Sequence, residues 1–276
     1  MNKLDGVLFI DKPQGLSSAR AVSKLKKFFL ASKVGHGGTL DPMATGLLPV
    51  LFGEATKFAF SSLESDKSYF AEVFLGISTD TGDSEGKVVA EKKVSCSFED
   101  IESIAKNLIG EQLQIPPMHS ALKYGGIPLY KLARKGLNVV RQPRIINIFK
   151  IEIKEINLPR LSFEIVCSKG TYVRSVAEKI GQELGCGGHL TKLHRNGIGK
   201  FNTKDMWTFN EIQNLYHSLD RQEFLARTFR PVDVLLEGLD FVCLNDVEAA
   251  KFLNGQTICL ADKVEKFINF QFYPKL

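Results

Sequence analysis

The stretch VGHGGTLDPMATGLLPV, residues 34–50, places a single carboxylate, Asp41, between glycines and an apolar run. Aspartate before proline is common in ordinary turns, because its side chain bonds nearby backbone and proline fixes φ. Local chemistry alone therefore favours a turn-forming residue, with a metal ligand and a catalyst as the alternatives. Two features favour a positioned carboxylate: small neighbours leave room for a bulky ligand, and the following LLPVLFG run anchors the loop on a core element.

Signatures of other common chemistries are absent from the sequence. There is no G-x-x-x-x-G-K-[ST] phosphate loop, no G-x-G-x-x-G after a strand, and no G-x-S-x-G nucleophile elbow. The five histidines form no H-E-x-x-H arrangement and the five cysteines form no C-x-x-C pair. A disulfide framework or a zinc site is therefore not expected.

The elements that must position Asp41 belong to a mixed architecture. Residues 6–10 and 68–76 have strand composition, and residues 148–156 and 161–170 show the alternation of a hairpin. Helices are predicted after Ser17 or Ser18, over residues 98–110 with Ser97 as cap, and from Thr171 to Gly185. Strands and helices do not alternate regularly, so the fold class is α+β with a mixed, largely antiparallel central sheet and flanking helices.

Charge is distributed unevenly along the 276 residues. Residues 113–204 carry 16 Lys and Arg against 5 Asp and Glu, and residues 1–60 carry 8 against 4. The segments 61–112 and 205–276 are net acidic. A concentrated basic region indicates a polyanionic partner, usually nucleic acid. No apolar run reaches the roughly 18 residues of a membrane span, and the N-terminal apolar run is too short for a signal peptide, so we expect a cytoplasmic protein without a membrane partner.

Six separated blocks between Gly6 and Phe201 carry a family resemblance. They read GVLFIDKPQGLSS, GHGGTLDPMATGLLPVLFGEATK, DKSYFAEVFLG, TDTGDSEG, QIPPMHSALKYGGIPLYKLARKG and CSKGTYVRSVAEKIGQELGCGGHLTKLHR. Together they resemble the TruB-type tRNA pseudouridine synthases. The resemblance implies the pseudouridine synthase fold and the isomerisation of uridine 55 in the T-loop of tRNA to pseudouridine. In this reaction the base is flipped out, cleaved from C1′, rotated and rejoined through C5, without a metal or organic cofactor.

The resemblance also implies roles for individual residues. Asp41 matches the catalytic aspartate, which acts either as a nucleophile at C1′ or as a base at C2′. Tyr69 matches a tyrosine that stacks on the flipped uracil and accepts the C5 proton, and Arg174 matches an arginine that pairs with the aspartate. An arginine beside Asp41 is expected to keep the carboxylate ionised by lowering its pKa. The remaining matches are a base-replacing histidine, a supporting turn and two pocket residues: His36, Lys12 with Pro13, Tyr172 and Leu193.

The domain organisation follows the same resemblance. Residues 1–230 are expected to form the catalytic domain, with a basic insertion at about 115–150 that grips the T-arm through Lys123, Lys131, Arg134, Lys135, Arg141 and Arg144. Residues 231–276 are expected to form a short, truncated segment that resembles a PUA domain. The simplest partner set is tRNA alone, with a monomeric enzyme and no obligate protein partner. The alternatives are an RNA-folding protein on this scaffold and a guide-RNA-dependent relative of the dyskerin type.

Overall fold

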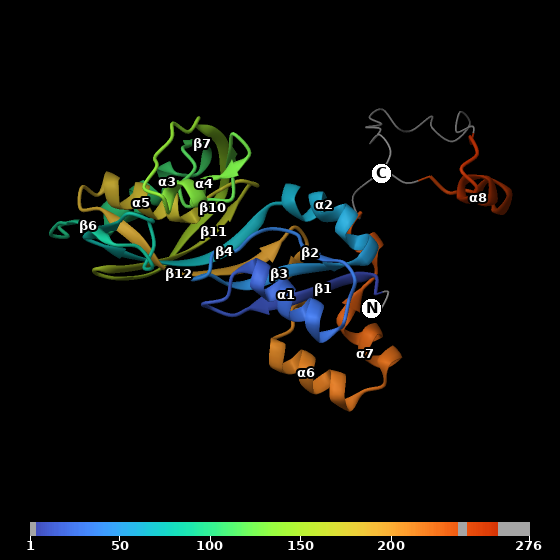
Figure 1. The fold of residues 1–276 in the computed structure, drawn as a ribbon. Helices are drawn as coiled ribbons and strands as arrows, with labels where there is room; N and C mark the ends of the chain where they lie inside the picture. Colours follow the sequence, from blue (N-terminus) through green and yellow to red (C-terminus); the bar gives the residue numbers. More distant parts are fainter. Residues whose placement is uncertain (1–3, 237–241, 259–276) are drawn as a thin grey trace. The chain divides into compact units, whose positions relative to one another are not determined.

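The computed structural model describes residues 4–236 and 242–258, and the chain divides into two compact units, Met1–Leu235 and Leu236–Leu276. The first unit is built on a ten-stranded sheet (Figure 1). Its main path runs β14 (Phe229–Arg230), β1 (Gly6–Lys12), β3 (Thr45–Phe52), β12 (Gly188–Ile198), β4 (Lys67–Leu75), β11 (Arg160–Cys167), β10 (Arg144–Asn157) and β7 (Gly110–Gln114). Strand β2 (Val34–His36) pairs with β3, and β13 (Phe201–Asn202) pairs with β12.

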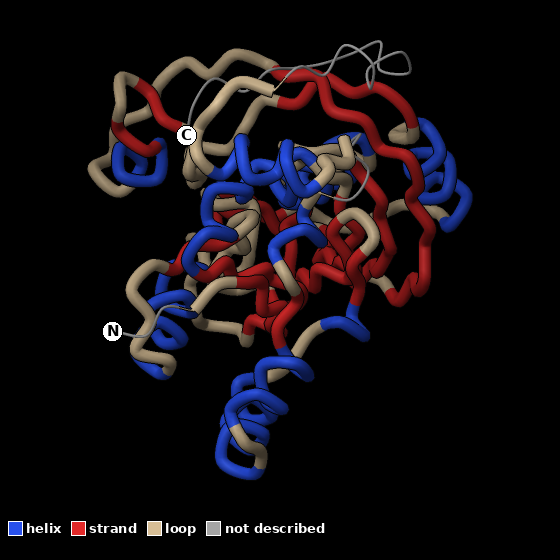
Figure 2. Tube along the Cα trace, turned by 90° about the vertical axis from the view of Figure 1, so that its right-hand side faces the viewer, coloured by secondary structure: helices blue, strands red, loops and turns tan. Residues whose placement is uncertain are grey.

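The pairing in this sheet is antiparallel except at one place. Strands β3 and β12 run parallel and are joined by two residue pairs, His194 with Thr45 and Arg195 with Gly46. The predicted α+β class with a mixed, largely antiparallel sheet is confirmed. The strands, drawn red in Figure 2, are curved rather than flat, as the handed twist of strands requires.

Burial explains the sequence patterns of the central strands. In β1, Leu8 and Ile10 join one hydrophobic core while Val7 and Phe9 join a second core. Strand β1 is therefore covered on both faces, which accounts for its unbroken apolar run. Strand β4 alternates buried with half-buried residues instead.

The helices begin where their caps predict. Ser17 caps α1 (Ser18–Phe28), and Ser97 with Asp100 forms a capping box on α3 (Phe98–Asn107). Helix α3 ends before Gly110, which already opens β7, and α5 (Val173–Glu183) begins two residues after Thr171. Helix α3 packs against β10 and helix α5 packs against β12, as Figure 1 shows. The other helices of the first unit are α2 (Ala59–Glu64), α4 (Leu129–Ala133), α6 (Phe209–Ser218) and α7 (Arg221–Thr228), with short 3₁₀ turns at Gly53–Phe58, Thr203–Asp205 and Val232–Leu235.

The predicted basic insertion contains a small hairpin, β8 (Lys123–Tyr124) with β9 (Ile127–Pro128), followed by α4. A second hairpin, β5 (Ile77–Thr79) with β6 (Val88–Glu91), lies between β4 and α3 in the sequence. The second unit contributes α8 (Asp246–Leu253). Half of the segment expected to resemble a PUA domain, residues 237–241 and 259–276, lies outside the described residues. In the described part of the chain, no helix has the length and apolar character needed to cross a membrane.

Candidate active site

The loop that carries Asp41 connects β2 to β3 and is fixed on both sides of the carboxylate. The Ser18 hydroxyl donates to the Leu40 carbonyl at 3.1 Å and accepts from the Leu40 amide at 2.8 Å. The Lys12 ammonium, fully buried, donates to the carbonyls of Pro13, Leu16 and Pro42. These hydrogen bonds connect the DKPQG turn to the residue after Asp41, so the backbone on both sides of Asp41 is fixed.

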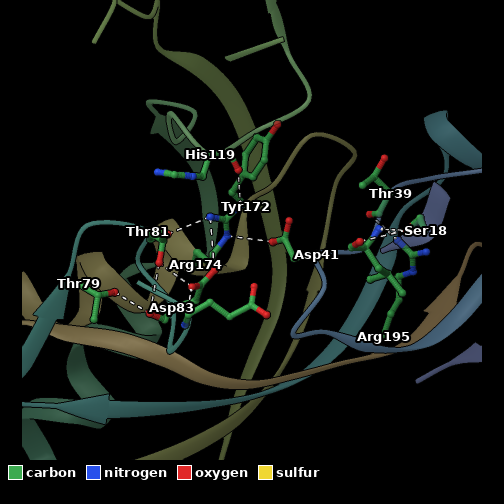
Figure 3. A network of polar contacts seen from close by, with 12 residues as sticks. Ser18, Thr39, Asp41, Thr79, Thr81, Asp83, His119, Tyr172, Arg174 and Arg195 are labelled. Atoms are coloured by element: carbon green, nitrogen blue, oxygen red, sulfur yellow. Dashed lines mark hydrogen bonds and ion pairs between the residues drawn. The ribbon is translucent and has the colours of Figure 1, made fainter. Parts of the chain in front are cut away.

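Arg174, near the start of α5, is the centre of a polar network around Asp41 (Figure 3). Its Nε lies 2.9 Å from Oδ2 of Asp41, and the arginine is only 3% exposed. Its two Nη groups donate to the carbonyls of Thr81 at 2.9 Å and His119 at 2.7 Å. The guanidinium therefore does not form a bidentate pair with Asp41. Only its Nε contacts the carboxylate, and its two Nη groups donate to backbone carbonyls that fix the orientation of the arginine.

Asp83 is a member of this network that no sequence argument singled out. Its Oδ2 lies 3.6 Å from Nη1 of Arg174, and its Oδ1 accepts from the Thr81 hydroxyl at 2.6 Å and the Glu85 amide at 3.1 Å. The side chain is 5% exposed. Asp83 lies in the block TDTGDSEG, but nothing in that block distinguishes it from an ordinary turn residue. Its partner, Arg174, lies 91 residues further along the chain.

The electrostatics of Asp41 differ from the expectation. Burial raises the pKa of the Asp41 carboxyl above its ordinary value, Arg174 opposes the rise, and the negative charge of Asp83 adds to it. The expectation that Arg174 would leave the pKa lowered omitted desolvation and the second carboxylate. Lys12 also favours the ionised form of Asp41, although burial lowers the pKa of Lys12 itself to about 8.

A cavity of about 320 Å³ opens beside Asp41 and collects the expected base-binding residues. Tyr69, Tyr172, Leu193 and Arg174 line it together with Lys67 and Arg195. The sheet register explains the grouping, because Tyr69 on β4 faces Arg195 on β12, and Ala71 faces Leu193. Burial raises the pKa of Tyr69, and Arg195 hydrogen-bonds its hydroxyl, so Tyr69 is a neutral phenol at neutral pH. The cavity volume is within the usual range for a small-ligand pocket.

A second cavity, of about 630 Å³, lies on another side of Asp41 and Arg174. His36, Arg20 and Arg134 contribute to its lining. The Nδ1 atom of His36 is buried without a hydrogen-bond partner among the described residues. Burial lowers the pKa of His36, so its ring is neutral at neutral pH. A neutral imidazole with a free polar edge is suited to stacking in the place of an extruded base.

Comparison with known proteins identifies the family of the chain. Residues 26–173 match the N-terminal domain of the TruB family of pseudouridylate synthases, and residues 174–237 match the C-terminal domain of tRNA pseudouridylate synthase B. The chain belongs to the TruB family.

Two curated relatives cover nearly the whole chain. The tRNA pseudouridine synthase B of Burkholderia lata (strain ATCC 17760) is 45% identical over 94% of this chain and 79% of the relative. The enzyme of the same name from Dechloromonas aromatica (strain RCB) is 44% identical over 94% of this chain and 85% of the relative. A chain from the crystal structure of a Cbf5–Nop10–Gar1 complex superposes with a TM-score of 0.73 at 28% identity, over 91% of this chain and 67% of that one.

The basic residues of this TruB-family chain are only partly gathered at the site. Arg134 lines the larger cavity and stacks 5.6 Å from the centre of the Tyr130 ring, and Arg141 donates to the Pro116 carbonyl at 3.0 Å. The other four insertion residues line neither cavity and are exposed; they are Lys123, Lys131, Lys135 and Arg144. No cluster of three or more His, Cys, Asp or Glu suited to a metal ion occurs within residues 4–236 and 242–258.

Proposed function

We propose that this enzyme isomerises uridine 55 in the T-loop of tRNA to pseudouridine. Membership of the TruB family supports pseudouridine formation, and relatives named tRNA pseudouridine synthase B support tRNA as the substrate. The observation that carries the proposal is the 2.9 Å ion pair of Asp41 and Arg174 at the wall of a cavity that also contains Tyr69.

The reaction begins with extrusion of the target nucleotide, because a base inside a folded RNA loop is out of reach of the carboxylate. Extrusion costs a few kcal/mol of stacking, and an aromatic platform such as Tyr69 returns about 1–3 kcal/mol. His36 fills the space that the base leaves. The uracil enters the smaller cavity, where Tyr172 and Leu193 contribute walls.

Asp41 then acts on the ribose, either as a nucleophile at C1′ or as a base at C2′. The C1′–N1 bond breaks and its electron pair goes to N1, so that uracil leaves as an anion held in the cavity. After rotation, C5 forms the new bond to C1′ while the C1′–Asp41 bond breaks, or, if Asp41 acted as the base, while Asp41 returns its proton to C2′. The C5 proton then passes to Tyr69, whose own hydroxyl proton must leave first because the resting side chain is a neutral phenol. No second carboxylate is required as an acid, because the leaving uracil is a stabilised anion, unlike the leaving group of an ordinary glycosidase.

Recognition of the T-arm is assigned to the insertion at about 115–150 and to the exposed lysines of α1, which are Lys24, Lys26 and Lys27. Phosphate contacts by exposed Lys and Arg side chains give affinity that falls steeply with salt. The shape of the RNA and its unstacked loop bases give specificity. Residues 1–230 are the catalytic domain in this proposal, and the enzyme acts on tRNA without a protein partner.

The deciding experiment uses a synthetic T-arm hairpin and the variant Asp41→Asn. The wild-type enzyme is expected to convert the target uridine of the bare hairpin, and Asp41→Asn is expected to bind the hairpin with near-normal affinity and form no pseudouridine. Pseudouridine formation by Asp41→Asn at a near-normal rate would refute the catalytic assignment. Likeness to a chain from a Cbf5–Nop10–Gar1 complex makes an enzyme that works only within a larger complex the second candidate, and conversion of the bare hairpin by the isolated enzyme excludes it.

A further inference from the structure

Two buried cations in the smaller cavity have no role in the reaction described so far. Lys67 on β4 is 8% exposed and Arg195 on β12 is 1% exposed, and both line the cavity with Tyr69. The register places Lys67 two residues before Tyr69, on the same face of β4, and pairs Arg195 with Tyr69 across the strands. The two cations therefore lie on the face of the sheet that carries Tyr69.

Neither cation is neutralised by an ion pair in the described part of the chain. Arg195 donates to the carbonyls of Leu47 at 2.8 Å, Thr39 at 3.4 Å and Gly38 at 3.3 Å. The Lys67 ammonium donates to the carbonyls of Leu63 and Ser65. Carbonyl oxygens satisfy the N–H groups but leave the positive charges uncompensated, and buried charges are normally paired.

The charge balance of the cavity is therefore positive. Among its lining residues the single carboxylate is Asp41, which already pairs with Arg174. The carboxylates that act on the pKa of Lys67 are those of Asp66 and Glu64, and Glu64 is an exposed residue paired with Lys169. Two buried, unneutralised cations favour the presence of an anion in the cavity.

We propose that Lys67 stabilises the uracil anion that forms when the C1′–N1 bond breaks, and that Arg195 is a positioning residue that holds the Tyr69 hydroxyl and the Gly38–Thr39 carbonyls in place. The proposal rests on the proposed function, since it concerns the leaving group of that reaction. The electron pair of the broken bond spreads from N1 over the O2 and O4 oxygens of the base. A fixed cation in the same cavity interacts more strongly with this developing anion than with the neutral base before cleavage. It therefore stabilises the transition state more than the ground state, and this difference accelerates the chemical step.

The state of Lys67 fits this assignment. Burial lowers the pKa of Lys67 to about 8, with the charge of Arg195 acting in the same direction. The ammonium form still predominates at neutral pH, but it has lost much of its hydration. An anion arriving at the base site therefore meets a poorly solvated cation.

A leaving-group experiment tests the role of Lys67. T-arm hairpins carrying uridine or 5-fluorouridine at the target position are compared under single-turnover conditions, and the loss of the target nucleoside is followed after nuclease digestion. Fluorine makes the base a better anion, so its departure needs less help from the protein. Lys67→Met is expected to slow uridine detachment about 100-fold, the scale of one preorganised electrostatic group, and 5-fluorouridine detachment at least fivefold less.

Two further variants isolate the charge. Lys67→Arg keeps the cation and is expected to show the wild-type ratio of rates on the two hairpins. Lys192→Met removes an exposed lysine that pairs with Glu72 at 3.0 Å, and both of its rates are expected to stay within twofold of wild type. Equal slowing of both hairpins by Lys67→Met, an unchanged rate, or a ratio in Lys67→Arg that departs from wild type would overturn the inference. A wild-type enzyme that converts neither hairpin would refute the proposed function instead.

Discussion

Replacing Arg174 by lysine separates the charge of this residue from its geometry. The guanidinium makes two hydrogen bonds to carbonyls, at 2.9 and 2.7 Å, and contacts Asp41 at 2.9 Å and Asp83 at 3.6 Å. One ammonium keeps the charge but cannot reach four acceptors in different directions. At least two buried acceptors then lose their donor, at about 1–3 kcal/mol each.

We therefore expect Arg174→Lys to lose about 3 kcal/mol of folding free energy and to form pseudouridine about 100-fold more slowly, because a carboxylate displaced by about 1 Å costs that much. Urea unfolding followed by circular dichroism measures the first quantity, and single-turnover conversion of the T-arm hairpin with enzyme in excess measures the second.

The control for Arg174→Lys is Arg160→Lys. Arg160 pairs with Glu72 at 2.9 Å but is 55% exposed, so the change is expected to cost less than about 1 kcal/mol and to leave the rate unchanged. A fully active Arg174→Lys enzyme with wild-type stability would refute the reasoning, since it would mean that charge alone positions Asp41.

Three more outcomes follow from the site. Burial raises the pKa of Asp41, and the proposed reaction needs its ionised form. The single-turnover rate should therefore fall as pH decreases through a value above the ordinary aspartate pKa. A rate that stays constant down to the ordinary aspartate pKa would contradict this prediction. Lys12→Met leaves the carbonyls of Pro13 and Leu16 without their donor, so the free energy of unfolding in urea should fall by about 1–3 kcal/mol. The same change removes a cation near Asp41, so the fall of the rate at low pH should move to higher pH. A fall at the wild-type pH would exclude an electrostatic contribution of Lys12. Converting Arg134 and Arg144 to Gln should reduce the slope of log affinity against log salt by about 0.7–0.9 for each phosphate that the protein no longer neutralises. Binding of the hairpin to the Asp41→Asn enzyme at several salt concentrations measures this slope. An unchanged slope would mean that the RNA binds to another surface.

The sequence predicted the site best where function depends on a whole motif. Asp41, Tyr69 and Arg174 were each ambiguous alone. The motif blocks around them made all three candidate site residues, and the structure brings them to one cavity. Asp83 was not predicted because its meaning depends on an interaction with Arg174 that forms only in three dimensions. The pKa direction of Asp41 was wrong for a related reason: sequence shows a charged partner but not how much water the fold removes.

The charge count illustrates a second limit. Arg174 and Arg195 belong to the basic segment 113–204, yet they are 3% and 1% exposed. Counting them as part of an RNA-binding surface overstated that surface, because sequence does not separate a cation that faces solvent from one that faces a cavity. Exposed Lys123, Lys131, Arg134, Lys135 and Arg144 are what remains of the predicted basic face in the insertion.

The short parallel junction between β3 and β12 links the strand that follows Asp41 to the pair of strands that holds Tyr69. Asp41 is attached to one side of the junction, through β3, and Tyr69 to the other side, through β4 and β12. Gly46 allows the closest approach there, because a Cβ atom at this position would lie 2.5 Å from the Arg195 carbonyl oxygen and 2.6 Å from its amide nitrogen. The spacing of Asp41 and Tyr69 is thus a property of backbone packing between two strands. A larger residue at Gly46 would separate these strands and change that spacing without altering any side chain that lines the cavity.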